Sequence, residues 1–155
     1  MTVWARLHVA VLAFWVGVML FFSGLLAPIA FQTFPQVQAG DLMNKLFAPY
    51  HVVGYVCGGA ALLTAWFAGG FRGKVRNALL IVLLGATLYA GGVLSPEART
   101  LRAELRQTDA GSKNPATKAR FDTLHRRAVT LNGGILIGAV TALAWAVASP
   151  PKRQK

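Results

Sequence analysis

Charged side chains are scarce in this sequence, and four long stretches contain none at all. Asp, Glu, Lys and Arg make up 14% of the 155 residues, against about 25% in a typical soluble domain. The stretches 7–40, 46–71, 77–96 and 128–151 lack all four residue types. Each is long enough to cross a hydrocarbon core of about 30 Å as a helix. A soluble chain of this length has too little surface to cover four such helices, which excludes a soluble globular protein.

Acidic residues and cysteine are rarer still, which limits the chemistry open to the chain. Cys57 is the only cysteine, so no intramolecular disulfide can form, and its place in an apolar stretch is typical of a packing residue. No acid lies within the four stretches, and a Ser-His-Asp set, a Gly-rich phosphate loop and a Cys-x-x-Cys pair are missing. We therefore expect no catalytic residue, no metal site and no cofactor, with haem as the alternative left open. The pattern favours a protein that is not an enzyme.

Basic residues are the exception to the scarcity of charge, because sixteen Lys and Arg stand against five acids. They lie at the ends of the apolar runs, where they anchor helices and contact anionic lipid headgroups. A nucleic-acid-binding protein would gather them on a folded soluble surface, which this chain does not have. Membrane lipids, and not nucleic acid, are the expected partners.

The uncharged stretches predict an all-α integral membrane protein, an up-down four-helix bundle that forms one domain over residues 1–155. We expect the spans at residues 3–29, 49–71, 77–94 and 128–149. The first apolar run is longer than a signal peptide allows, so it is expected to be a retained span.

Two prolines set the expected ends of the first two spans. Pro28 should kink or stop the first span near its end, since a proline inside a helix interrupts its hydrogen bonds. Pro49 should begin the second, because proline is welcome in a first turn. Between them we expect a loop at 31–40 and an amphipathic interfacial turn at 41–48.

The longest connection, residues 95–127, predicts a short helical hairpin outside the membrane that extends the third and fourth spans. Apolar residues recur at helical spacing on both of its sides, and a turn signal separates them over residues 110–115. These apolar residues are Ala98, Leu101, Leu105, Phe121 and Leu124. The Gly-x-x-x-Gly pairs Gly54–Gly58 and Gly134–Gly138 predict close packing between helices of the same chain.

The distribution of basic residues gives the expected orientation. Seven Lys and Arg lie on the side of the termini and nine on the other side. The connector 72–76 and the C-terminal tail carry no acid that would offset their charge, which favours cytoplasmic termini. We expect the protein in a bacterial inner membrane.

One membrane face of such a bundle should gather polar residues. In the second span, His51 and Tyr55 share a helix face, and in the fourth span His125 and Asn132 do the same. Polar groups inside a membrane usually face the bundle interior or a cavity. The sequence therefore predicts a positively charged pocket for an anionic group, such as a lipid phosphate or a carboxylate. Its ligand-binding residues would be His51, Tyr55, Glu97, Arg99, His125, Arg126 and Asn132.

Several of these residues also have a simpler interpretation. Tyr50 and Tyr55 fit interfacial anchors, and His51 and His125 fit interfacial histidines bonded to carbonyl groups. Asn132 fits a structural hydrogen bond between helices, because a lone amide inside a span needs a partner.

Short motifs along nearly the whole chain resemble a known family. They are Trp15-x-Gly17, Ala27-Pro28-x-x-Phe31, Lys45-Leu46-Phe47-x-x-Tyr50-His51, Pro96-x-x-Arg99, Phe121-x-x-Leu124-His125 and Asn132. Together they resemble the transmembrane protein 205-like family of small four-span membrane proteins. The resemblance implies the four-span fold and, from the eukaryotic members, a link to metal-drug resistance and transport. Leu7-His8 with Trp15-x-Gly17 is also similar to the first span of HemJ-type protoporphyrinogen oxidases and of copper-resistance D-type membrane proteins.

Three functions follow as hypotheses. The first is a non-enzymatic membrane protein that binds a small molecule or metal complex, or helps to move it, through the polar pocket. The second is an accessory subunit of a larger membrane complex. The third is a membrane oxidoreductase linked to haem or a porphyrin through its histidines.

Overall fold

The computed structural model describes residues 2–69, 73–108 and 115–148, and the regular elements within these ranges are all helical. In chain order they are α1 (Val3–Leu20), the π-helical segment η1 (Phe21–Leu26), α2 (Ala27–Thr33), α3 (Gln36–Gly69), α4 (Lys74–Tyr89), the π-helical segment η3 (Ala90–Leu94), α5 (Ser95–Thr108) and α6 (Pro115–Ala148).

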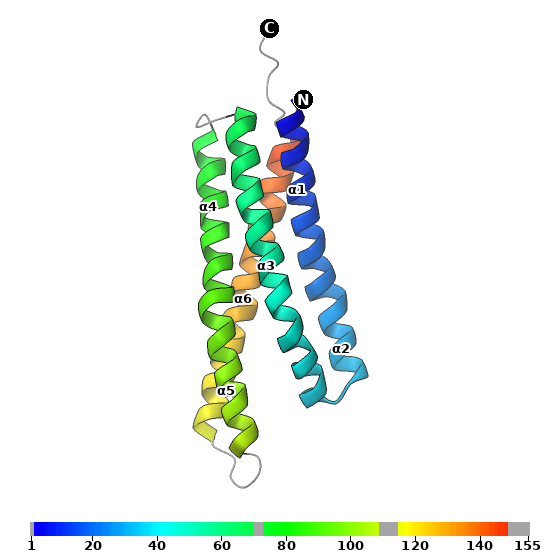
Figure 1. Ribbon diagram of the computed structural model, residues 1–155, viewed down its shortest axis with the longest axis vertical. Coiled ribbons are helices and arrows are strands. Elements are labelled where there is room, and N and C mark those ends of the chain that lie inside the picture. Colours follow the sequence, from blue (N-terminus) through cyan, green and yellow to red (C-terminus); the bar gives the residue numbers. More distant parts are fainter. Residues whose placement is uncertain (1, 70–72, 109–114, 149–155) are drawn as a thin grey trace.

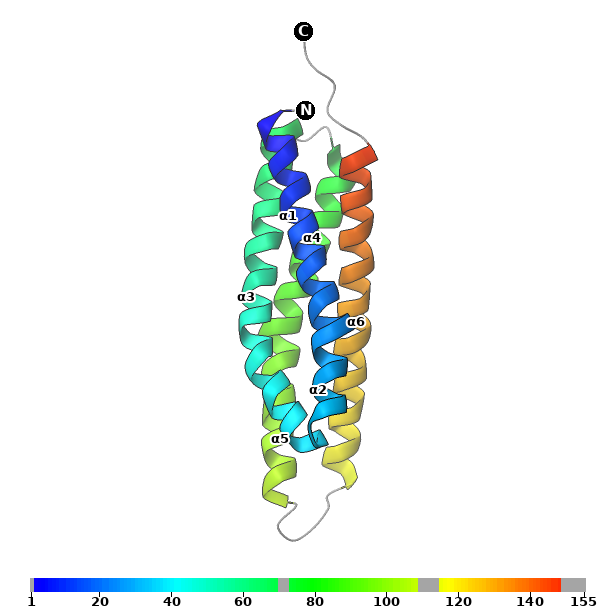
Figure 2. The same ribbon diagram turned by 90° about the vertical axis from the view of Figure 1, so that its right-hand side faces the viewer.

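The described elements join into four long helices that alternate in direction. Each is long and apolar enough to cross a membrane: Val3–Thr33, Gln36–Ala68, Lys74–Arg106 and Pro115–Ala148. The start of α1 and the end of α6 lie at the same end of the bundle (Figure 1, Figure 2). The predicted all-α four-helix membrane bundle is therefore confirmed.

Both π-helical segments lie directly before a proline, Pro28 in α2 and Pro96 in α5. In each, the residue before the proline donates its N–H to the carbonyl five residues earlier. Proline lacks an N–H and its ring crowds the carbonyl four residues earlier, and a widened turn makes room for it. Of the two predicted effects of Pro28, a stop is wrong, because the helix continues past Ile29 to Thr33 with a widened turn before the proline.

The second span begins well before its predicted start at Pro49. The N–H of Ala39 donates to the carbonyl of Pro35 at 3.0 Å, so Pro35 is the proline that stands at the start of α3. Pro49 lies inside α3, where neighbouring helices let a membrane helix tolerate a proline. The predicted loop 31–40 is therefore too long, since only residues 34–35 connect α2 and α3, and the segment 41–48 is part of α3 and not a turn.

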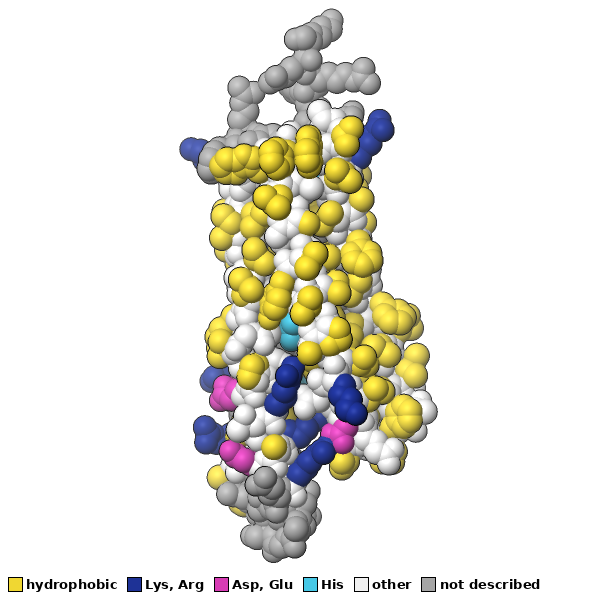
Figure 3. All heavy atoms as spheres, in the orientation of Figure 1, with side chains coloured by type: hydrophobic (Ala, Val, Ile, Leu, Met, Phe, Trp, Pro, Cys, Tyr) yellow, Lys and Arg dark blue, Asp and Glu magenta, His cyan; other side chains and the backbone are white. Residues whose placement is uncertain are grey.

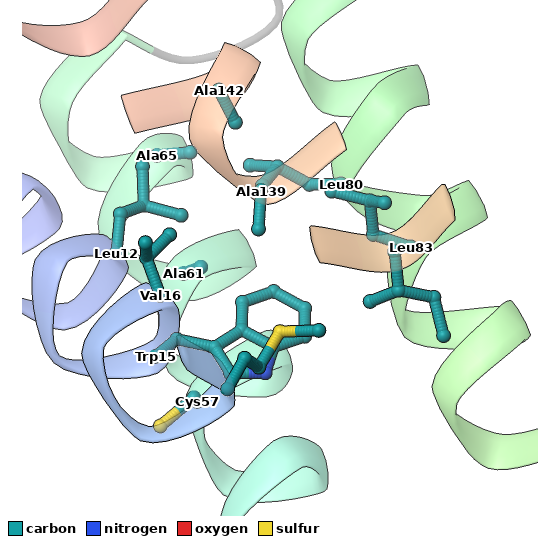
Figure 4. Close-up of a cluster of buried hydrophobic side chains, with 12 residues drawn as sticks. Leu12, Trp15, Val16, Cys57, Ala61, Ala65, Leu80, Leu83, Ala139 and Ala142 are labelled. Carbon is teal, nitrogen blue, oxygen red and sulfur yellow. The ribbon is translucent and has the colours of Figure 1, made fainter. Parts of the chain in front are cut away.

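One hydrophobic core joins all four long helices in the half of the bundle that holds the termini, which we call the common half. Trp15 and Leu12 of α1 are buried at its centre, beside Leu80 of α4 (Figure 4). Alanines complete the core: Ala61 and Ala65 from α3, Ala139 and Ala142 from α6. Small side chains let helix backbones approach closely, which is the main source of helix association in lipid.

The predicted glycine seams belong to this packing. A Cβ on Gly54 would lie 2.8 Å from Thr87 Cγ2, and one on Gly58 would lie 2.9 Å from Leu84 Cδ1. Gly138 packs against Leu83 of α4 in the same way, whereas Gly134 has open space around it. Three of the four glycines thus hold helices of one chain together.

Towards the other end the bundle divides into two arms, each with a core of its own (Figure 1). The first arm, residues 21–48, packs η1 and α2 on the start of α3 around Phe22, Ala30 and Met43. The second arm comprises residues 94–108 and 115–128 and packs η3 and α5 on α6 around Leu94, Leu101 and Leu124.

The second arm is the predicted hairpin. Ala98 and Phe121 lie against its core, so the prediction that its apolar stripe closes on itself is confirmed. The predicted turn lies outside the described residues, except for Pro115 at the start of α6.

The surface has the distribution expected of a membrane protein. On the face shown in Figure 3, hydrophobic side chains cover a broad band, Lys and Arg lie towards both ends of the molecule, and Asp and Glu lie only towards the lower end. Large apolar side chains of the long helices, such as Val56 and Ile137, are exposed, as contact with lipid requires.

Candidate functional site

A chain of hydrogen bonds links three helices where the arms separate. The Tyr50 hydroxyl in α3 donates to Asn132 Oδ1 in α6 at 2.7 Å, and Asn132 Nδ2 donates to Ser23 Oγ in η1 at 3.1 Å. We call these three residues the polar node. Tyr50 packs against both the common core and the core of the first arm. The node therefore lies at the fork of the bundle.

His51 lies beside the node and has an unusual environment. Its ring stacks between Phe47, at 5.9 Å between centroids, and Tyr55, at 6.3 Å. Gly91 of η3 approaches it so closely that a Cβ there would lie 2.7 Å from His51 Cγ and would collide with the Tyr55 hydroxyl. Among the described residues, the buried His51 Nδ1 has no hydrogen-bond partner. A buried ring nitrogen without a partner is a costly group that a ligand or a water can satisfy.

Two residues of the node, Tyr50 and Asn132, line one small pocket between the helices together with His51. Its walls include Trp15 and Met19 of α1 and Thr87 of α4. The cavity has a volume of about 10 Å³, which is close to the smallest space that holds one water molecule. The pocket is thus closed around a water-sized space in this structure.

The structure brings only part of the predicted site together. His51 and Asn132 share the pocket, and Tyr55 lies directly beside it across Gly91. Arg99 is exposed but near enough for its charge to act on the His51 ring. Whether these residues bind a ligand stays a prediction.

The other predicted residues lie elsewhere on the second arm. Glu97 lines a separate surface hollow with Arg120 and Arg127. His125 is exposed and stacks on Phe121 at 6.1 Å, and Arg126 is exposed as well.

His125 is displaced because the bundle has already divided at its level. Equal helical phase does place His125 and Asn132 on one face of α6. At Asn132 that face meets α3 and η1. Nearer the start of α6 the two arms have separate cores, so the same face has no first arm to pack on. The prediction that His125 shares the pocket of Asn132 required the four helices to stay packed together along their whole length.

Sequence reasoning missed several residues that form this site. Tyr50 was interpreted as an interfacial anchor, and Ser23, Gly91 and Thr87 gave no signal of their own. The sequence does hold a signal for Ser23. It lies five residues before Pro28, in the segment where the proline requires a widened helical turn. The simpler interpretation of Asn132, a hydrogen bond between helices, agrees with its contacts.

Basic side chains of α5 bridge the two arms near their ends. Arg106 forms an ion pair with Asp41 of α3. Arg102 lies against Gly40 of α3, and its guanidinium also lies over the Phe121 ring at 5.3 Å from the centroid. These contacts hold the arms together where they do not share a hydrophobic core.

Metal ligands do not gather at the fork. Across residues 2–69, 73–108 and 115–148, no three His, Cys, Asp or Glu side chains are placed so that they could hold a metal ion. Cys57 is buried in the common core and contributes to its packing.

Comparison with known proteins identifies relatives of the greater part of the chain. A family model described as "Domain of unknown function (DUF4149)" matches residues 10–107. An "Uncharacterized protein" of Aquifex aeolicus (strain VF5) is 32% identical over 98 residues, which cover 63% of this chain and 71% of the relative. No solved structure matches the chain. The segment matched by the family model contains the first arm, Tyr50, His51 and Gly91, and ends before α6.

Proposed function

Because the chain belongs to the DUF4149 family of unknown function, and because its helices form a forked membrane bundle, we propose that it binds an anionic small molecule at the fork. It would help to move this molecule at one membrane face without transforming it chemically. The proposal depends on one observation: the polar node lies beside His51, whose buried Nδ1 has no hydrogen-bond partner among the described residues.

The proposal also includes the membrane in which the protein lies, its orientation there and a narrower family. We assign the protein to the bacterial inner membrane with both termini in the cytoplasm, so that the fork faces outward. We also propose that the chain is related to the transmembrane protein 205-like family, which its short motifs resemble. A reporter enzyme that is active only outside the cytoplasm, inserted in the connection 109–114, should be active. An inactive but stable fusion would reverse the orientation.

The charge around the fork supports an anionic ligand. Asp41 is engaged by Arg106, while Lys45 and Arg99 are exposed on the two arms. A guanidinium group forms strong, directional hydrogen bonds with phosphate and carboxylate oxygens. The aromatic and aliphatic side chains between the arms would suit an attached alkyl chain. An amphiphile with an anionic head therefore fits both surfaces.

The small volume of the pocket requires that the arms part before such a ligand can enter. About 10 Å³ accommodates no organic headgroup. The arms have separate hydrophobic cores, so they can separate without opening the common core. The π-helical segments η1 and η3 lie at the base of the two arms, and such segments are frequent at functional sites.

Binding of chain-matched amphiphiles to the purified protein tests the proposal. Native mass spectrometry would compare hexadecyl phosphate with hexadecyl maltoside, which has the same chain and an uncharged head. We expect tighter binding of the phosphate by about tenfold, which corresponds to about 1.4 kcal/mol. His51→Ala and Asn132→Leu should each remove this preference and leave the protein folded.

His125→Ala is the matched control, because His125 lies on the same half of the bundle but outside the pocket. It should bind as the wild type does. Equal binding of the two amphiphiles, or a preference that survives both pocket substitutions, would refute the proposal. If the two pocket variants only lower stability, the node is a structural element.

A further inference from the structure

The opposite end of the bundle holds a second polar cavity, distant from the fork. It is lined by Ala5 and His8 of α1, Arg76 of α4 and Trp145 of α6, with Gly73 at its rim, and its volume is about 90 Å³. A volume of this size accommodates about three water molecules or one small oxyanion.

The hydrogen bonds of His8 indicate which of its two ring nitrogens is left as an acceptor. Thr64 Oγ1 donates its single proton to a carbonyl of its own helix, at 2.7 Å from Ala60 O. It must therefore accept from His8 Nδ1, which lies 3.0 Å away. In a neutral ring the proton is then on Nδ1, and Nε2 carries a lone pair. His8 is only 2% exposed, and within the described part of the chain its Nε2 has no partner.

Arg76 supplies a positive charge to the same cavity, and among the described residues no acidic side chain forms an ion pair with it. One terminal nitrogen donates to the Ala65 carbonyl at 2.9 Å, while the buried Nε has no partner among the described residues. All five acidic residues of the sequence lie between Asp41 and Asp122, and those that are described belong to the two arms. A half-buried guanidinium without a counterion is costly, so an anion bound in this cavity would be stabilised.

We propose that this cavity binds a phosphate or carboxylate group, held between the Arg76 guanidinium and the His8 imidazole. The ligand must offer an oxygen to Arg76 Nε–H and an O–H to His8 Nε2. A singly protonated phosphate monoester does both; with a fully ionised group, the proton resides on His8 instead. The N-terminus of α4, with Gly73 as its N-cap and no side-chain cap, adds favourable backbone N–H groups.

This ligand chemistry has two sources, a free anion or a lipid headgroup, and NMR of ¹⁵N-histidine separates them. The chain has three histidines, so His51→Gln and His125→Gln assign the His8 Nε2 resonance by elimination. In neutral detergent micelles, sodium phosphate and sodium acetate test the free anion. Phosphatidylcholine nanodiscs with added phosphatidic acid or phosphatidylglycerol test the headgroup.

We expect the His8 Nε2 resonance to shift with at least one of these anions. If the source is lipid, phosphatidic acid should act more strongly than phosphatidylglycerol, because only its phosphomonoester can bring the proton. Arg76→Gln should abolish the shift, and so should Ala146→Leu, which fills the cavity while keeping both polar groups. Lys74→Gln, an exposed cation two residues from Arg76, is the control and should leave the shift intact.

A resonance that responds to none of the four probes would mean that water alone fills the cavity, and the proposal would be wrong. It would also be wrong if the shift survived both Arg76→Gln and Ala146→Leu. Asn132→Leu should not affect the result, because the fork lies at the other end of the bundle.

Discussion

The two halves of this bundle are built on different principles, although the same four helices form both. In the common half, all four helices share one core of tightly packed alanines, leucines and one tryptophan. In the forked half, each pair of helices has its own core, and polar or charged contacts join the pairs: Tyr50–Asn132–Ser23 and Asp41–Arg106. One bundle thus combines a half with a single shared core and a half in which two pairs of helices have separate cores.

The difference follows from the distribution of small residues and prolines. Alanines and glycines at the helix contacts of the common half permit close backbone approach. In the forked half, Pro28, Pro49 and Pro96 interrupt three of the four long helices, and two of them follow a widened turn. Helices interrupted at similar depth can change direction there, and the polar node occupies the point of divergence.

The largest effect is expected from a substitution in the common core. Trp15→Ala removes the largest fully buried side chain and should lower the free energy of unfolding by about 3–5 kcal/mol. Unfolding by sodium dodecyl sulfate in mixed micelles measures it. The neighbouring Phe14 faces lipid and is 61% exposed, so Phe14→Ala should cost far less. Equal losses for the two would mean that the common core does not anchor the bundle.

The next largest loss of stability is expected for one of two adjacent glycines in η3, Gly91, and not for the other, Gly92. Gly91→Ala places a methyl group against His51 and the Tyr55 hydroxyl, whereas Gly92→Ala meets nothing within 4 Å. Overpacking of this kind costs about 1–3 kcal/mol, so Gly91→Ala should unfold at clearly lower denaturant than the wild type. Gly92→Ala should be neutral or slightly stabilising, since alanine favours helix. Identical behaviour of the two variants would contradict the close approach of η3 to α3.

A smaller effect is expected at the polar node. Tyr50→Phe and Asn132→Leu remove the two ends of one hydrogen bond of 2.7 Å. Because such bonds in membrane proteins average about 0.6 kcal/mol and reach about 1.7, a double-mutant cycle should give a coupling energy in this range. A coupling of zero would show that the node does not hold the fork closed.

The smallest effect concerns the ion pair between the arms. Both side chains are substantially exposed, 49% for Arg106 and 38% for Asp41. Arg106→Gln should therefore change the free energy of unfolding by no more than about 1 kcal/mol. The same substitution should speed hydrogen exchange of the first arm while leaving the common half unchanged. Faster exchange throughout the bundle would mean that the arms are not independent units.

Sequence reasoning identified the four spans because each uncharged stretch is a property of one helix alone. It also identified the hairpin, since the apolar spacing of Leu101 and Leu124 implies a partner within the same connection. It misplaced the start of the second span, because local rules let either Pro35 or Pro49 begin a helix. In the structure the helix begins after Pro35, and Met43 lies between the two prolines and packs in one core with Ala30.

The site was predicted in part for a similar reason. The alternation of spans was enough to bring His51 and Asn132 to one pocket. His125 lies outside this pocket because the helices diverge at the fork. Such divergence cannot be predicted from the spacing of residues within a single helix. The close approach of Gly91 to Tyr55 likewise depends on two helices at once.

The most direct test of the account is the distance between the arms, measured by double electron–electron resonance. Spin labels at Val37 and Ala103 would report the separation of the two arms, and labels at Val56 and Ile137 would report the common half. All four positions are exposed, and the buried Cys57 would be replaced by alanine. On addition of hexadecyl phosphate, we expect the distance between the arms to increase and the distance in the common half to stay constant. If hexadecyl phosphate binds and neither distance changes, or if both change together, the forked bundle does not open as proposed.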